Sequence, residues 1–168
     1  MDILFTEDDI KKQIQKIAKT INNDFKDQEV ILLCILKGSI YITCELAKYL
    51  EMPINFEFMQ VSSYKDDKST GNVIIKKDLD ISIENKNVII VEDIVDSGIT
   101  LSKLIPVLKS RDPKKLKVFT LINKPAKRKV EINVDYNCFT IDEDYFLVGY
   151  GLDYNQKYRN LPYVGILK

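Results

Sequence analysis

The chain has 168 residues, 45% of them hydrophobic, and its 25 basic and 25 acidic residues give a formal net charge of zero. This size suits one folded domain over 1–168, and a neutral chain has no general basic field with which to hold nucleic acid or an anionic membrane. Because the chain contains no His, Ser-His-Asp and Cys-His catalysis are excluded, and a general base must be Asp, Glu, Lys, Tyr or Cys.

Hydrophobic periodicity predicts strands and helices that alternate along the chain. Apolar residues recur at helical spacing from Ile10 to Phe25, after Thr6 and Asp9, which resemble a capped helix start. The next elements predicted are a buried strand over 29–38, a helix over 39–52 stopped by Pro53, a strand over 54–64 and a return strand over 72–81. They are followed by a continuous apolar strand over 87–94, a helix over 100–112 with Pro106 near its start or at a kink, and strands over 117–124, 136–141, 145–151 and 163–167. Strand–helix–strand repeats of this kind favour a parallel α/β sheet.

Several classes of protein and site are excluded by what these elements lack. The longest unbroken apolar run is "VILLCIL", residues 30–36, far short of the roughly 20 residues that a membrane helix needs. The N-terminal "MDILFTEDD" has no signal-peptide pattern, so we expect a cytoplasmic protein. The three Cys are widely spaced and form no zinc pattern without His. A metal would therefore take oxygen ligands, and Mg²⁺ is the natural candidate.

The most informative stretch is "VIIVEDIVDSGIT", residues 88–100. Glu92 and Asp93 end a strand, where ligands of parallel α/β sheets bind. The run 97–100 enters a helix N-terminus, where free N–H groups and the helix dipole favour a phosphate. Carboxylates accept from sugar hydroxyls, so one segment can hold both ends of a ribose 5-phosphate, with Asp96 between them. The alternative is a plain helix cap, formed by Asp96 and Ser97 after a core strand.

This stretch resembles the phosphoribosyl pyrophosphate (PRPP) signature of the type I phosphoribosyltransferases, and most closely that of the hypoxanthine-guanine phosphoribosyltransferase family. The resemblance continues in the family's motif order through "LKGS" (36–39), "SSYKDDKSTG" (62–71), "LINKP" (121–125) and "YFLVGYGLDYNQKYRNLP" (145–162). It implies an α/β fold with a central, mainly parallel sheet flanked by helices and a small hood formed by the terminal segments. It also implies a Mg²⁺-dependent purine salvage enzyme that is a homodimer or homotetramer.

The resemblance assigns a role to each motif. The residues that would bind the ribose and 5-phosphate of PRPP are Glu92, Asp93, Asp96, Ser97, Gly98, Ile99 and Thr100. Those that would bind pyrophosphate are Lys37, Gly38 and Arg159, and the Leu36–Lys37 bond can be a cis peptide in this family. Those that would bind the purine are Lys124, Phe146, Leu147 and Asp153. Ser63 and Tyr64 would belong to a mobile loop that excludes water, and the Mg²⁺ ligands would be Asp153, Glu92 and Asp93.

The reaction that the resemblance implies joins hypoxanthine or guanine to PRPP and gives IMP or GMP and pyrophosphate. In it, Asp96 accepts or hydrogen-bonds a purine proton, and Lys124 donates to the 6-oxo group. An ammonium finds no acceptor on the amino group of adenine, so hypoxanthine and guanine are favoured. From the residues alone, Lys124 would be a surface lysine, Phe146 a core residue, and most charges of "KPAKRK" (124–129) a solvated loop.

Other functions remain open at this point. They are a xanthine-preferring enzyme, a PRPP-sensing regulator without catalysis, and a pyrimidine or adenine transferase. The regulator would contact nucleic acid through a basic face, which zero net charge disfavours. The pyrimidine or adenine transferase would share the PRPP motif but not the segments around Lys124 and Phe146–Asp153.

Overall fold

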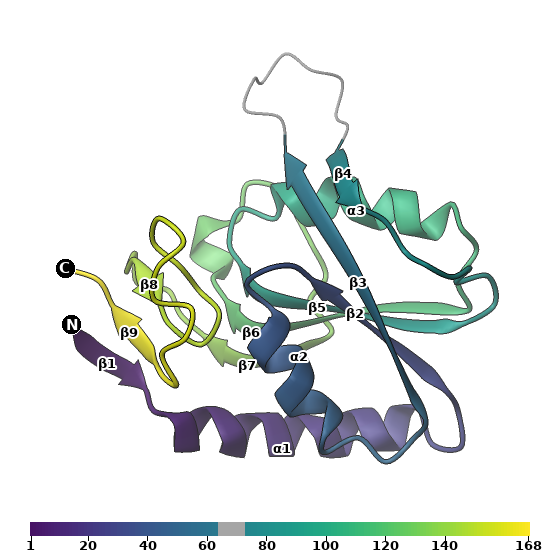
Figure 1. Ribbon diagram of the computed structural model, residues 1–168, viewed down its shortest axis with the longest axis horizontal. Coiled ribbons are helices and arrows are strands. Elements are labelled where there is room, and N and C mark those ends of the chain that lie inside the picture. The colour runs from purple at the N-terminus through teal and green to yellow at the C-terminus, as the bar shows by residue number, and fades with distance from the viewer. Residues whose placement is uncertain (64–72) are drawn as a thin grey trace.

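The computed structural model describes residues 1–63 and 73–168, and Figure 1 shows a central sheet between helices, with a smaller sheet beside it. Among the described residues the central sheet has six strands in the order β4-β3-β2-β5-β6-β7. Their bounds are β2 Val30–Ile35, β3 Ile54–Ser63, β4 Val73–Lys77, β5 Asn87–Val95, β6 Lys115–Asn123 and β7 Tyr136–Thr140. Among the described strands of the central sheet, only the β3–β4 pair is antiparallel. The predicted, mainly parallel sheet is confirmed.

Helices cover both faces of this sheet, which explains the continuous apolar sequence of its central strands. The helices are α1 Glu7–Asp24, α2 Ile40–Ala47 and α3 Ile99–Lys109, with a short 3-10 turn, η1, at Pro125–Lys127. Ile89 and Val91 of β5 share a core with α1 and α2, whereas Val88 and Ile90 share a second core with α3. Alternate residues of one strand therefore pack on opposite layers of helices.

The helix boundaries partly match the sequence prediction. Thr6 caps α1, because its side chain accepts from the Asp9 N–H while the Asp9 carboxylate accepts from the Thr6 N–H, so the predicted cap is confirmed. The prediction that α2 extends to residue 52 is wrong. The side chain of Asn22 in α1 hydrogen-bonds the carbonyl of Tyr49 and the N–H of Glu51, which holds this segment outside the helix.

Pro106 does not lie near the start of α3, as one of the two predicted alternatives had it, because it lies in the second half of the helix; the kink stays a prediction. Proline removes one backbone donor from a helix interior, and α3 ends only three residues later, at Lys109.

The smaller sheet is formed by terminal segments, as predicted. It pairs β1 Asp2–Phe5, β9 Val164–Ile166 and β8 Leu147–Val148 in the order β1-β9-β8, and both pairs are antiparallel. Both ends of the chain lie beside it in Figure 1. The sequence did not reveal β1, whose strand partner lies at the other end of the chain. In the described ranges no helix is long and apolar enough to cross a membrane.

Candidate active site

The central sheet reverses its direction of winding between β2 and β5. The chain leaves β2 through α2 toward β3, and it leaves β5 through α3 toward β6. Ligands of open α/β sheets bind at such a point, because the diverging loops leave a crevice at the carboxyl ends of the strands. A cavity of about 300 Å³ lies here, and its lining includes Leu36–Gly38, the whole run Glu92–Leu101, Asp153 and Arg159.

Of the two acids near the end of β5, Glu92 is buried and Asp93 is partly buried. Glu92 is only 9% exposed, and burial together with the adjacent Asp93 raises the pKa of its carboxyl well above the ordinary value. Burial also raises the pKa of Asp93 to about 6, even though its Oδ1 accepts a hydrogen bond of 2.7 Å from the Ile94 N–H, which favours the charged form. The shared cause is burial, which disfavours the charged form of both carboxyls.

Asp96 lies after β5 and is exposed, at the entrance to α3. Its Oδ1 accepts a hydrogen bond of 2.6 Å from the N–H of its own successor, Ser97. The N-cap residue of α3 is Gly98, with φ +78°, and Ser97 Oγ accepts from the Ile99 N–H at 3.3 Å. The alternative in which Asp96 caps α3 is therefore wrong, because Asp96 bonds no N–H of that helix in the described contacts.

Gly38 lets the loop after β2 contact two other segments of the site, the end of β5 at Asp93 and the loop that contains Gly151. A Cβ at Gly38 would lie 1.7 Å from Asp93 Oδ2, and one at Gly151 would lie 1.9 Å from the carbonyl oxygen of Gly38. Neither position has room for a side chain, so three loops distant in sequence meet at backbone contact. The Leu36–Lys37 peptide bond is cis, as the family resemblance implied.

A second cavity, of about 380 Å³, adjoins the first. The residues that line both cavities are Asp93, Ile94, Asp96 and Asp153. The second cavity adds Lys124, Phe146 and Leu147 from two further segments of the chain. The structure thus brings the predicted PRPP and purine residues to one continuous crevice.

Lys124 and Phe146, which the residues alone would place on the surface and in the core, both line this second cavity. Lys124 is only 4% exposed, and its Nζ donates to the carbonyl oxygen of Tyr145 at 3.1 Å. Phe146 is 52% exposed and meets Tyr154 edge-on, with 5.6 Å between ring centroids. The surface-lysine and core-phenylalanine interpretations are therefore both wrong.

The cations of the first cavity are held by one hydrogen-bond network. Arg159 Nη2 forms an ion pair with Asp153 Oδ1 at 3.0 Å and donates a hydrogen bond to Gln156 Oε1 at 3.2 Å. Lys37 Nζ donates to the same Gln156 oxygen at 3.2 Å, and the Gln156 N–H donates to Asp153 Oδ2 at 2.8 Å. Gln156 thus joins three predicted site residues. Sequence reasoning missed it, because an uncharged amide in a loop carries no signal of its own.

Comparisons with known proteins agree with this geometry. The family model described as "Phosphoribosyl transferase domain" matches residues 2–155. Hypoxanthine-guanine phosphoribosyltransferase of Bacillus subtilis strain 168 is 40% identical over 99% of this chain and 92% of that protein. The enzyme of the same name from Streptococcus pneumoniae strain R6 is 44% identical with the same coverage. This chain belongs to the hypoxanthine-guanine phosphoribosyltransferase family.

Solved structures of the hypoxanthine-guanine phosphoribosyltransferase family share the fold. A crystal structure of a Staphylococcus aureus hypoxanthine phosphoribosyltransferase, 42% identical, has a TM-score of 0.95 and covers 100% of this chain and 91% of that one. A Bacillus anthracis hypoxanthine-guanine phosphoribosyltransferase with a HEPES molecule in its active site, 38% identical, has a TM-score of 0.95 and covers 100% and 99%. The predicted family, fold and phosphoribosyltransferase activity are confirmed.

The mobile loop expected from the hypoxanthine-guanine phosphoribosyltransferase resemblance stays a prediction. Ser63 ends β3, where its backbone pairs with Val73, and Tyr64 lies outside the described residues. In the basic cluster, Lys127 and Lys129 are exposed as expected, but Arg128 is partly buried and bonds the backbone after β5. The solvated-loop interpretation is wrong for Arg128.

The donor set of the crevice fits a magnesium ion that arrives with its substrate. Within the described residues, no group of three or more His, Cys, Asp or Glu side chains is arranged to hold a metal. Mg²⁺ commonly binds through one or two carboxylates, with substrate phosphates and water as its other ligands. Asp93 and Asp153 line the same cavity and supply oxygen donors of that kind.

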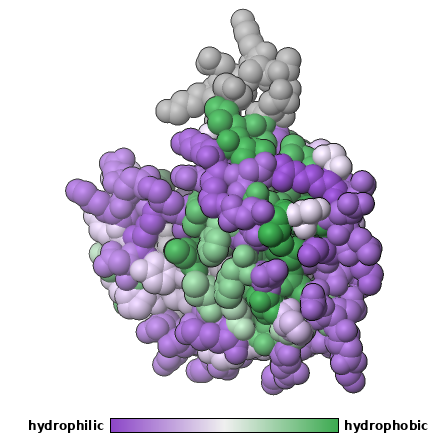
Figure 2. Space-filling model, turned by 45° about the vertical axis from the view of Figure 1, so that its right-hand side comes forward, coloured by the Kyte–Doolittle hydropathy of each residue, from purple (hydrophilic) through white to green (hydrophobic). Residues whose placement is uncertain are grey.

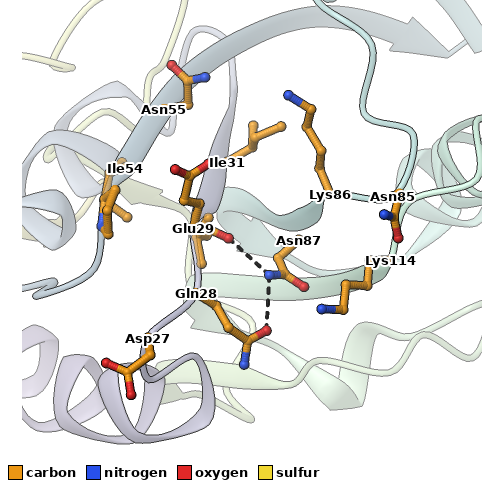
Figure 3. A pocket seen from close by; sticks show the side chains of 12 residues that line it. Asp27, Gln28, Glu29, Ile31, Ile54, Asn55, Asn85, Lys86, Asn87 and Lys114 are labelled. Atoms are coloured by element: carbon orange, nitrogen blue, oxygen red, sulfur yellow. Dashed lines mark hydrogen bonds between the residues drawn. The ribbon is translucent and has the colours of Figure 1, made fainter.

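Another cavity, of about 440 Å³, lies at the amino ends of the parallel strands (Figure 3). In its wall, Asn87 Nδ2 donates to Gln28 Oε1 at 3.2 Å and to the carbonyl oxygen of Glu29 at 3.0 Å. Its lining contains none of the predicted site residues, and ligands of this fold bind at the opposite edge of the sheet. We therefore place the active site in the crevice at the carboxyl edge.

Proposed function

We propose that the protein transfers the 5-phosphoribosyl group of PRPP to hypoxanthine or guanine and releases pyrophosphate, with IMP or GMP as the nucleotide product. Relatives that match almost the whole chain bear the corresponding name. One observation carries the proposal. The first cavity, which contains the N-terminus of α3, and the second cavity, which contains Lys124 and Phe146, share Asp96 and Asp153. The new bond between sugar and base would form where the two cavities meet.

The first cavity suits each part of PRPP. Glu92 and Asp93 would accept from the ribose hydroxyls at the end of β5. The N-terminus of α3 (Ser97–Thr100) would donate to the 5-phosphate. Lys37, the Gly38 backbone and Arg159 would hold the pyrophosphate, for which a guanidinium offers two parallel donors.

The second cavity suits a 6-oxopurine. Lys124 Nζ uses one donor on the carbonyl of Tyr145 and has two more for the 6-oxo oxygen of the base. Phe146 would stack on the purine ring, and the Leu147 backbone would read its edge. The amino group of adenine offers no acceptor to these two remaining donors. Because unsatisfied donors of a buried cation are costly, adenine would be disfavoured.

The chemistry would follow from these positions. As the bond to pyrophosphate breaks, the anomeric carbon gains positive charge, and an imidazole-ring nitrogen of the purine attacks it. Asp96 would accept the proton from the other nitrogen of that ring, which keeps the nucleotide product uncharged on its base. A bound Mg²⁺, held by Asp153 with Glu92 and Asp93, would neutralise charge on the departing pyrophosphate. Lys37 and Arg159 would add to that stabilisation.

We also propose that the protein is a homodimer or homotetramer in the cytoplasm. Figure 2 shows hydrophobic side chains gathered in a band down one face, bordered by hydrophilic ones. The exposed large hydrophobic residues include Ile40 and Tyr41 of α2 and Phe56 of β3, at 42%, 43% and 44% exposure. Contiguous exposed apolar surface often marks a protein–protein interface. Sedimentation analysis would distinguish the monomer from both oligomers.

A spectrophotometric assay with PRPP, Mg²⁺ and each of four purines tests the function. We expect turnover with hypoxanthine, guanine or both, and none with adenine. A strong preference for xanthine would support the alternative specificity. PRPP binding without turnover of any purine would instead support the regulator and contradict the proposal.

A further inference from the structure

Arg128 lies behind the loop that follows β5, on the segment after the purine lysine. Its Nη1 donates to the carbonyl oxygens of Val95 at 3.0 Å and Asp96 at 2.7 Å. Its Nη2 donates to the side-chain oxygen of Asn123 at 2.5 Å. Among the described carboxylates, none forms an ion pair with Arg128. The guanidinium thus binds the backbone of this loop and the Asn123 side chain, and no described carboxylate competes for it.

These contacts fix the direction of two successive peptide units. In a trans peptide the C=O and N–H point in opposite directions. Because the carbonyls of Val95 and Asp96 face Arg128, the N–H groups of Asp96 and Ser97 face away from it. The Ser97 N–H donates to Asp96 Oδ1, so the Asp96 carboxylate lies on the side of its peptide unit opposite to Arg128.

Backbone N–H groups on both sides of Arg128 also donate to the carbonyls of this loop. The N–H of Lys124 donates to the Val95 carbonyl at 2.9 Å, and those of Lys129 and Val130 donate to the Ser97 carbonyl at 2.9 and 3.1 Å. Three successive carbonyls of the loop therefore accept from one segment. A loop that binds an anion must turn its carbonyls away and its N–H groups toward the ligand, and this segment enforces that arrangement.

We infer that Arg128 is a positioning residue that orients the 95–98 loop, so that its donors face the 5-phosphate of PRPP and Asp96 faces the purine. The inference rests on the proposed function, since it assigns the phosphate to this loop. Arg128 touches no substrate in this assignment. Its contribution comes from orienting the peptide units and from a positive charge placed behind them.

Binding of two separate probes tests the inference, namely ribose 5-phosphate and inorganic pyrophosphate, each by calorimetry on the full chain. Hydrogen bonds to charged groups contribute about 1.5–3 kcal/mol, so Arg128→Met should weaken ribose 5-phosphate binding roughly ten- to a hundredfold. Pyrophosphate binding should be unchanged, because Lys37 and Arg159 belong to other loops. Lys129→Met is the matched control, since it removes the same charge from an exposed neighbour and should bind both probes normally.

Three outcomes would overturn the inference. They are normal ribose 5-phosphate binding by folded Arg128→Met, equal weakening of both probes, and equal effects of the two variants. If Arg128→Met does not fold, Arg128→Lys keeps the charge but loses the fork of donors, and normal ribose 5-phosphate binding by it would also overturn the inference. A wild-type protein that binds ribose 5-phosphate but turns over no purine would refute the proposed function alone.

Discussion

Replacing Asp96 by Asn tests the proposed division of labour in the crevice. Asp96 lines both cavities and is exposed, whereas Glu92 is buried and Asp93 is partly buried near the end of β5. The chain has no His, and Asp96 is the acid that we propose receives a proton from the purine. Asn is nearly isosteric with Asp but cannot accept that proton.

The size of the effect follows from what Asn keeps and what it loses. Within the described residues, the Asp96 carboxylate accepts one hydrogen bond, of 2.6 Å from the Ser97 N–H, and an amide oxygen can accept the same bond. Folding and PRPP affinity should therefore stay near their wild-type values. General base catalysis contributes about 10²–10⁴-fold, which corresponds to roughly 3–5 kcal/mol of activation free energy. We expect turnover to fall by that factor.

The assay is steady-state kinetics with hypoxanthine and guanine, combined with calorimetric titration of PRPP. Asp144→Asn is a suitable control, because Asp144 lines the purine cavity and pairs with Lys127 at its exposed edge but has no role in proton transfer. Normal turnover by Asp96→Asn would refute the general base. Equal losses of turnover and PRPP affinity would assign Asp96 to the ribose phosphate instead.

Three other predictions concern the base, the metal and the thiols. Lys124→Met keeps the buried stem but removes the donor, so kcat/KM for hypoxanthine and guanine should fall roughly ten- to a hundredfold while PRPP affinity stays constant; unchanged purine kinetics would remove Lys124 from the site. EDTA should abolish turnover and Mg²⁺ restore it, and Asp153→Asn should raise the Mg²⁺ concentration required; full activity in excess chelator would contradict the metal assignment. Burial raises the pKa of Cys138 to about 12 and also raises the pKa of the Cys34 thiol, whereas Cys44 is exposed. Ellman's reagent at pH 8 should therefore titrate Cys44 rapidly in the native protein and all three thiols after denaturation, and rapid labelling of native Cys44→Ser would contradict the burial.

The sequence alone determined most of the elements and indicated the stretch 92–100 that lines the first cavity. The apolar run 88–91 within the strand predicted over 87–94 indicated a strand covered on both faces, and all four of these residues are buried in β5. The acids and small residues after it predicted a ligand site at a strand end, because backbone donors and carboxylates gather where a strand meets a helix. Local chemistry of this kind can be read without knowing what lies across the sheet.

Only the tertiary structure decided how distant segments act on one another. From the sequence alone, Lys124 would be a surface residue and Phe146 a core residue. Their shared cavity arises from the packing of separate loops. Strand β1 was missed because β9, at the far end of the chain, supplies its pairing. Arg128 looked like one more charge in a basic loop. Its contacts with the carbonyls of Val95 and Asp96 exist because parallel neighbours β5 and β6 end side by side, a proximity that no local pattern encodes.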